Sequence, residues 1–76
     1  EDSAHQRTAF LAAISHELRT PVTVARGHLE TLERRGADDP DRVRATTRLV
    51  REELTHLGRL VDDLLALARA PLDDFV

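Results

Sequence analysis

The sequence predicts an all-α protein, an antiparallel two-helix hairpin that dimerises into a four-helix bundle. Hydrophobic residues make up 41% of the 76 residues and are nearly all Leu, Val and Ala, while 33% of the residues are charged. The chain has only two aromatic residues and no cysteine. This composition fits long amphipathic helices better than a sheet, and it excludes disulfides and thiolate metal sites.

The first helix is expected over about residues 3–35. Ser3 and Gln6 have the spacing of a capping box, and acidic residues precede them. Apolar or small residues then recur mostly three or four positions apart, as one face of a helix requires. These positions are Phe10, Ile14, Leu18, Ala25, Leu29 and Leu32. Gly36 suits the position that follows the last helical residue.

After a turn at residues 36–39, the second helix is expected over about residues 40–69. Asp39 is a favourable N-cap, and Pro40 suits the first helical position, where no backbone N–H is needed. Mostly apolar residues follow in a heptad with alternating steps of four and three. The heptad consists of Val43, Thr47, Val50, Leu54, Leu57, Val61, Leu64 and Ala68.

Such a hairpin leaves part of its broad apolar surface uncovered. Pairing of two hairpins would bury that surface in one bundle, so a homodimer is expected. The alternative is that the helices pack on another domain of the same protein. Pro71 should end the second helix, which makes residues 1–70 one domain and residues 71–76 the start of a linker.

Charge and hydropathy exclude several function classes. The net charge is −3, and the eleven arginines form no basic run and have no aromatic platform beside them. The apolar runs are only a few residues long, too short to span a bilayer, and no signal-peptide pattern is present. We therefore expect neither nucleic-acid binding nor direct membrane contact. If the parent protein is anchored in a membrane, the anchor would lie outside this chain.

Residues 15–21, SHELRTP, combine a histidine, a carboxylate and a hydroxyl with a proline inside the first helix. A proline in a helix interior removes one backbone hydrogen bond and clashes with the carbonyl four residues back, at a cost of about 3 kcal/mol. Here that carbonyl belongs to Glu17, directly beside His16. Local strain of this kind is retained most readily where it has a use, which makes the segment a candidate functional site.

His16 shares a helical face with Thr20, Thr23 and Gly27, since spacings of four, seven and eleven stack along one side. The apolar positions lie towards the other side, so His16 is expected to point into water. A neutral imidazole can act as a nucleophile through a ring nitrogen, although an incidental surface histidine is the plainer alternative. A zinc site of the HExxH type is rejected, because Thr20 stands where the second histidine is needed, and no metal site is expected.

Residues 10–23, FLAAISHELRTPVT, resemble the H-box of sensor histidine kinases nearly residue for residue. LVDDLL at residues 60–65 is also typical of that family, and Val22 departs only conservatively from the usual leucine. The resemblance covers most of the chain. It implies a dimerisation and histidine-phosphotransfer domain of a bacterial two-component kinase, the phosphoacceptor part of that enzyme.

The resemblance also implies roles for individual residues. His16 would take the γ-phosphoryl group of ATP and donate it to an aspartate of a response regulator. Glu17 would act as the general base through the other ring nitrogen, and Thr20 would orient a water molecule for phosphatase activity. Thr23 and Gly27 would lie on the surface that binds the regulator.

Pro21 would either loosen the helix, so that it switches between activities, or only set a static kink, and the sequence leaves both open. The chain has three glycines and no asparagine, so no cofactor is expected to bind it; ATP and Mg²⁺ are expected to bind a separate catalytic domain after Val76. The implied partners are a second copy, a response-regulator receiver domain and that catalytic domain. The implied location is the cytoplasmic part of a membrane-anchored protein. Alternative functions are a purely structural dimerisation module and a free-standing phosphotransfer protein.

Overall fold

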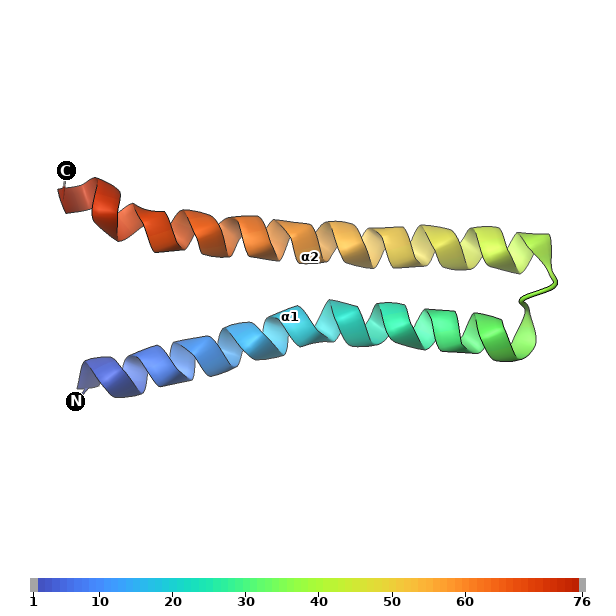
Figure 1. Ribbon diagram of the computed structural model, residues 1–76, viewed down its shortest axis with the longest axis horizontal. Coiled ribbons are helices and arrows are strands. Elements are labelled where there is room, and N and C mark those ends of the chain that lie inside the picture. Colours follow the sequence, from blue (N-terminus) through green and yellow to red (C-terminus); the bar gives the residue numbers. More distant parts are fainter. Residues whose placement is uncertain (1, 76) are drawn as a thin grey trace.

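Two long antiparallel helices joined by a short turn make up the structure (Figure 1). This computed structural model describes the backbone of residues 2–75 and the side chains of residues 3–69. Helix α1 spans Asp2–Arg35 and helix α2 spans Pro40–Phe75. No strand occurs within residues 2–75, and the predicted all-α hairpin is confirmed.

The hairpin is a single layer of two helices. It measures 55 × 26 × 9 Å, and the smallest dimension is about the diameter of one helix, so both broad faces are uncovered. Among the described side chains only Pro21 and Ala25, the latter 8% exposed, are buried. Neither described helix contains a stretch long and apolar enough to cross a membrane. The hairpin alone therefore has almost no core.

The two helices pack along a seam, in which buried and half-buried side chains recur with alternating steps of three and four. The seam residues of α1 are Ile14, Leu18, Pro21, Ala25, His28 and Leu32, and those of α2 are Thr46, Val50, Glu53, Leu57, Leu60 and Leu64. Most of these side chains are apolar, as the contact face of an amphipathic helix requires. His28, Thr46 and Glu53 are polar exceptions that periodicity alone did not identify.

The heptad predicted for the second helix coincides only partly with this seam. Val50, Leu57 and Leu64 belong to both, whereas Leu54 and Val61 are 55% and 41% exposed. The heptad therefore lies slightly to one side of the contact with α1. Its exposed members form an apolar stripe that the hairpin leaves uncovered.

The turn is held by side chains at the start of α2. Asp39 caps the helix as predicted, since its Oδ1 accepts a hydrogen bond from the backbone N–H of Asp41 at 3.0 Å. Arg42 reaches back and donates from Nη1 to the carbonyl oxygen of Arg35 at 3.3 Å, while its Nε lies 3.6 Å from Asp39 Oδ2. A Cβ at Gly36 would lie 2.5 Å from Arg42 Cδ, so the glycine makes room for that arginine.

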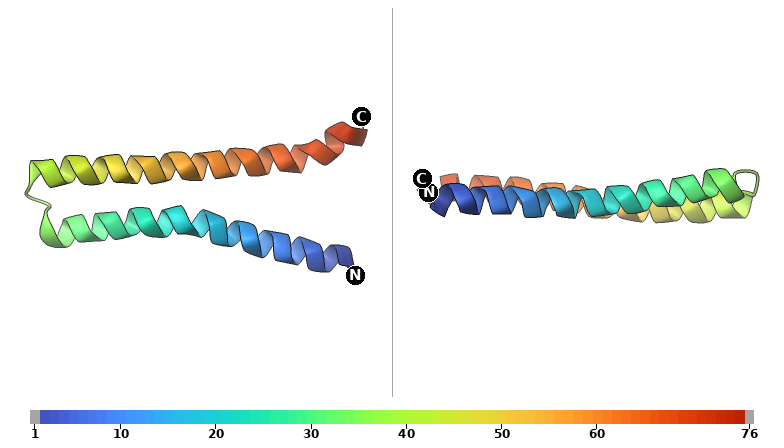
Figure 2. Two further views of the ribbon diagram at one scale, coloured as in Figure 1. Left: turned by 180° about the vertical axis from the view of Figure 1, so that it is seen from behind. Right: turned by 90° about the horizontal axis from the view of Figure 1, so that it is seen from below.

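Helix α1 bends near its middle, in the segment that contains Pro21 (Figures 1 and 2). Pro21 has no N–H to donate to the carbonyl of Glu17, so the helix has one bond fewer at this point. The ring of Pro21 is buried on the seam, one turn before Ala25. The bend therefore falls where α1 packs most closely against α2.

The N-terminal cap predicted at Ser3 does not form as expected. Helix α1 already begins at Asp2, so Ser3 lies inside the first turn and not at the N-cap position. Glu1, which precedes the helix, lies outside the described residues. Helix ends commonly differ from sequence-based boundaries by one or two residues.

The predicted end of the second helix at residue 69 is wrong. Helix α2 continues through Pro71 to Phe75. A proline removes one helical hydrogen bond but can be accommodated by a change of direction, and Figure 1 shows α2 turning away in its last turns. That residues 71–76 lead to a further domain stays a prediction, and Val76 lies outside the described residues.

Candidate functional site

His16 lies on the side of α1 that faces away from α2. The seam residues Ile14 and Leu18 stand two positions before and after it, and two helical positions differ by about 160° around the axis. The side chain of His16 is exposed, as predicted. Its imidazole is therefore available to a second protein without any change in the packing of the hairpin.

Thr20 lies one turn after His16 on the same face and is exposed. Its Oγ1 donates a hydrogen bond to the backbone carbonyl of His16 at 3.0 Å. This bond fixes the side-chain rotamer and uses the hydroxyl proton, while the oxygen lone pairs remain able to accept a hydrogen bond from water. The observed geometry is compatible with a water-orienting hydroxyl.

Glu17 is exposed and lies about 100° around the helix from His16. Between the described side chains of Glu17 and His16 there is no hydrogen bond or ion pair. Glu17 instead lines the groove between the helices, where it borders two neighbouring hollows. Its role as a general base remains a prediction.

Thr23 and Gly27 continue the face of His16 towards the turn, and both are exposed. A Cβ built on Gly27 would meet nothing within 4 Å, so the packing of the hairpin does not require glycine there. Because Thr23 and Gly27 are small, no bulky side chain projects from these positions next to His16. The binding role predicted for them is not tested by this geometry.

An open hollow of about 460 Å³ lies between the helices beside the motif. Its lining residues are Glu17, Thr20, Pro21, Glu52, Glu53, His56 and Leu60. The motif of α1 thus faces a carboxylate pair and a second imidazole from α2, which the sequence analysis did not assign to the site. The sequence contains one indication of these residues: in an antiparallel hairpin, residues at similar distances from the turn lie at the same level.

A second hollow of about 260 Å³ continues this groove towards the N-terminal half of α1. It shares Glu17 and Leu60 with the first, and its other walls are mainly apolar. Its remaining lining residues are Phe10, Ala13, Ile14, Leu18, Asp63, Leu64 and Leu67. The groove therefore changes from polar beside Thr20 to apolar beside Phe10.

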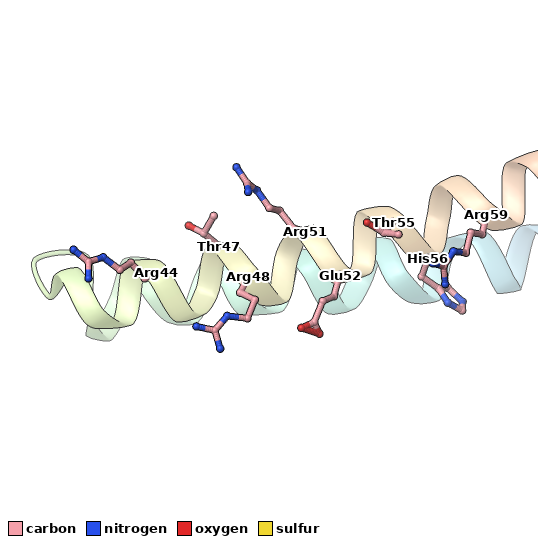
Figure 3. Close-up of a pocket in the computed structure, with 8 residues that line it drawn as sticks. All are labelled: Arg44, Thr47, Arg48, Arg51, Glu52, Thr55, His56 and Arg59. Carbon is pink, nitrogen blue, oxygen red and sulfur yellow. The ribbon is translucent and has the colours of Figure 1, made fainter.

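The outer surface of α2 is basic along part of its length. Arg44, Arg48, Arg51 and Arg59 line a shallow region of this surface together with Glu52 and His56 (Figure 3). Exposed arginines of this kind are ordinarily solvated. Among the residues that the structure describes, no three His, Cys, Asp or Glu side chains are grouped so that they could hold a metal ion.

Comparison with known proteins identifies the family. Residues 6–72 match the family model described as His Kinase A (phospho-acceptor) domain. Signal transduction histidine-protein kinases named ArlS, from Staphylococcus aureus strains USA300, COL and MRSA252, are each 35% identical to the chain over 74 residues. The match covers 97% of this chain but 16% of the relative, so the chain spans about a sixth of the length of these kinases. No solved structure matches the chain.

The family match and the geometry agree on the part of a kinase that this chain represents. The matched residues include the whole of the SHELRTP motif, the turn, and the parts of both helices between residues 6 and 72. The match supports a phospho-acceptor function and not a purely structural dimerisation module. The chain belongs to the His Kinase A (phospho-acceptor) domain family.

Proposed function

We propose that His16 is the residue that carries the phosphoryl group. The observation that supports this most directly is its position in SHELRTP together with its exposure on the face of α1 opposite the seam. A ring nitrogen of His16 attacks the γ-phosphorus of ATP, a nitrogen–phosphorus bond forms, and ADP leaves. The phosphoryl group then passes to an aspartate carboxylate of a response regulator, which forms an oxygen–phosphorus bond and restores the imidazole.

Glu17 and Thr20 act beside His16 in this proposal. The Glu17 carboxylate accepts a hydrogen bond from the ring nitrogen that does not react, which makes the other nitrogen a better nucleophile. For this it rotates from the groove towards the imidazole, a movement that its exposed side chain permits. Thr20 orients the water that hydrolyses the acyl phosphate of the regulator, for which it retains free acceptor lone pairs after bonding to the His16 carbonyl.

Labelling with ATP tests the assignment of His16. The full-length parent kinase is incubated with ATP labelled on the γ-phosphate, as wild type and as His16→Gln. We expect acid-labile label on the wild type and none on the variant, with unchanged helical content by circular dichroism. Equal labelling of the two proteins would remove His16 as the acceptor.

A second substitution separates transfer from hydrolysis. Thr20→Ala should retain phosphorylation of the histidine and transfer to the regulator, because neither step uses the hydroxyl. Release of inorganic phosphate from the phosphorylated regulator should fall by about 10²-fold, as for loss of a group that positions a reactant. Parallel loss of all three activities would contradict a separate role for Thr20.

The functional unit is a homodimer in this proposal. The exposed stripe on α2 consists of the heptad residues Val43, Leu54 and Val61, together with Leu65 on the same side of the helix. On α1, Leu11, Val22 and Leu29 are likewise exposed on the side next to the seam residues Leu18, Ala25 and Leu32. Two hairpins packed through these stripes form one four-helix core, and His16 stays outside it because it lies about 120–140° around α1 from the stripe.

The remaining partners follow from the chemistry. ATP and Mg²⁺ are supplied by a catalytic domain elsewhere in the parent protein, in line with the sixfold greater length of the related kinases. The phosphoryl acceptor is a receiver domain that docks over Thr23 and Gly27. Because ATP and receiver domains are cytoplasmic, the domain works on that side of a membrane-anchored bacterial sensor.

A further inference from the structure

His56 of α2 and the motif of α1 line the same hollow. Thr20, Glu17 and Pro21 form one wall, and Glu52, Glu53 and His56 form the wall opposite. His56 is exposed, and Figure 3 shows it projecting from the same edge of α2 as Glu52, one turn earlier. An imidazole is the one side chain in this set that ordinarily both accepts and releases a proton near neutral pH.

Hydrolysis of an acyl phosphate releases a proton that such a group can accept. As the water oxygen bonds to phosphorus and the bond from phosphorus to the aspartate oxygen breaks, the aspartate leaves as a carboxylate and the water loses a proton. Thr20 can orient the water, but its hydroxyl proton is already donated to the His16 carbonyl and a hydroxyl is a weak base. Within the motif, Glu17 and His16 are already assigned to the phosphorylation step, whereas His56 is the imidazole that lines the hollow together with Thr20.

We propose that His56 accepts the proton of the hydrolytic water when the domain dephosphorylates its regulator. The inference rests on the phosphatase activity proposed above and assigns a further residue to it. In the step, a neutral imidazole nitrogen of His56 takes the proton, inorganic phosphate forms, and the regulator regains its aspartate. The imidazolium then returns the proton to solvent.

Charged side chains of both signs surround His56. Glu17 lines the hollow from α1, and Glu52 and Glu53 line it from the same helix as His56. Arg59 borders the same imidazole from the outer surface of α2. Glu52 stands four residues before His56, the spacing at which a helical carboxylate and an imidazole share one face.

The hollow also stays open in the dimer proposed above. Leu54 belongs to the exposed stripe and is two positions before His56, about 160° away around α2. Glu17 and Val22 are about 140° apart on α1 by the same rule. A partner hairpin on the stripe therefore leaves the side of the groove with His56 accessible to a receiver domain.

The test uses the full-length parent kinase without ATP and a receiver domain that the wild-type kinase phosphorylates. The receiver is loaded with acetyl phosphate and freed of excess reagent, and release of inorganic phosphate is followed between about pH 5.5 and 8. The variants are His56→Gln, Thr20→Ala and, as a matched control, His5→Gln, which makes the same chemical change near the start of α1. Phosphorylation of the kinase and transfer to the receiver are measured in parallel.

Because only a neutral imidazole can accept a proton, we expect the wild-type rate constant to be higher at about pH 8 than at about pH 5.5. His56→Gln should lower it by about 10²-fold at pH 8 and remove its pH dependence, while phosphorylation and transfer remain at wild-type level and His5→Gln behaves as wild type. If the His56→Gln variant keeps the wild-type pH profile, proton transfer through His56 is overturned, whatever the size of its rate constant. A wild-type kinase without phosphatase activity overturns the underlying function as well, whereas loss confined to Thr20→Ala overturns only the role of His56.

Discussion

The exposed stripe of α2 leads to a quantitative prediction about dimerisation. Leu54 is 55% exposed in the hairpin, and pairing through the stripe would bury that part of its surface. Complete burial of a leucine side chain stabilises by about 1.5–3 kcal/mol, so about half of that is gained per copy. Leu54→Ala should then weaken the dimer by about 1–2 kcal/mol over its two copies, after allowing for the methyl group that alanine keeps.

A loss of this size corresponds to an increase of about tenfold in the dissociation constant of the dimer. Sedimentation equilibrium at several concentrations measures that constant directly. Alanine has at least the helix propensity of leucine, so α2 itself is not weakened by the substitution. The change in the dissociation constant therefore measures the loss of interface contacts and not a loss of helix stability.

Leu67 offers a matched control on the same helix. It is 52% exposed, close to Leu54, but lies about 140° away around α2 and lines the apolar part of the groove. Leu67→Ala should leave the dissociation constant unchanged. If Leu67→Ala weakened the dimer as much as Leu54→Ala, or if neither did, the stripe would not be the dimer interface.

Two further predictions concern the backbone of the hairpin. Pro21→Ala restores an N–H that can bond to the Glu17 carbonyl, which is worth about 3 kcal/mol in a helix interior, but it also removes a buried ring. The free energy of unfolding, measured by chemical denaturation, should therefore rise by about 1–2 kcal/mol. A changed ratio of kinase to phosphatase activity would favour a switching bend, and an unchanged ratio would favour a static one. Asp39→Ala removes the acceptor of the Asp41 N–H and should cost about 1 kcal/mol, whereas Asp39→Asn, which keeps an acceptor oxygen, should cost much less. Equal losses in the two variants would contradict the cap.

Local signals were sufficient to predict much of the hairpin. Asp39 and Pro40 mark the start of α2 because an N-cap and a first-turn proline act through neighbouring residues only. The end at residue 69 could not be predicted in the same way. Whether Pro71 ends a helix or only bends it depends on the segments on both sides, and here the helix continues to Phe75.

The exact face of α2 that packs against α1 could not be predicted from the sequence either. A seam with one neighbour and a stripe for another have the same alternating period, and Leu57 contributes to the first while Leu54, three positions earlier, belongs to the second. Periodicity defines the apolar side of the helix but not which part of it each neighbour covers. The half-buried Glu53 shows this most clearly, since an apolar pattern cannot include it.

For the site, spacing along one helix identified His16 and Thr20 on a common exposed face, because positions four apart always stack. It could not reveal His56, which enters the hollow from the other helix. The position of His56 in this hollow depends on which residues of α1 and α2 lie opposite one another and on which side of the seam each residue lies. Both are properties of the packed pair and of neither helix alone.

The seam with α2 and the proposed reactive face of His16 lie on different sides of α1. Ile14 and Leu18 pack against α2, and His16 between them points the opposite way, so an accessible nucleophile removes no apolar side chain from the seam. Leu18 and Pro21 are motif residues that also lie on the seam, and the missing N–H of Pro21 alters the backbone at Glu17. A displacement of α2 against α1 would therefore reach the motif through these two residues, while substitutions at Thr23 or Gly27 would change the reactive face and leave the seam intact.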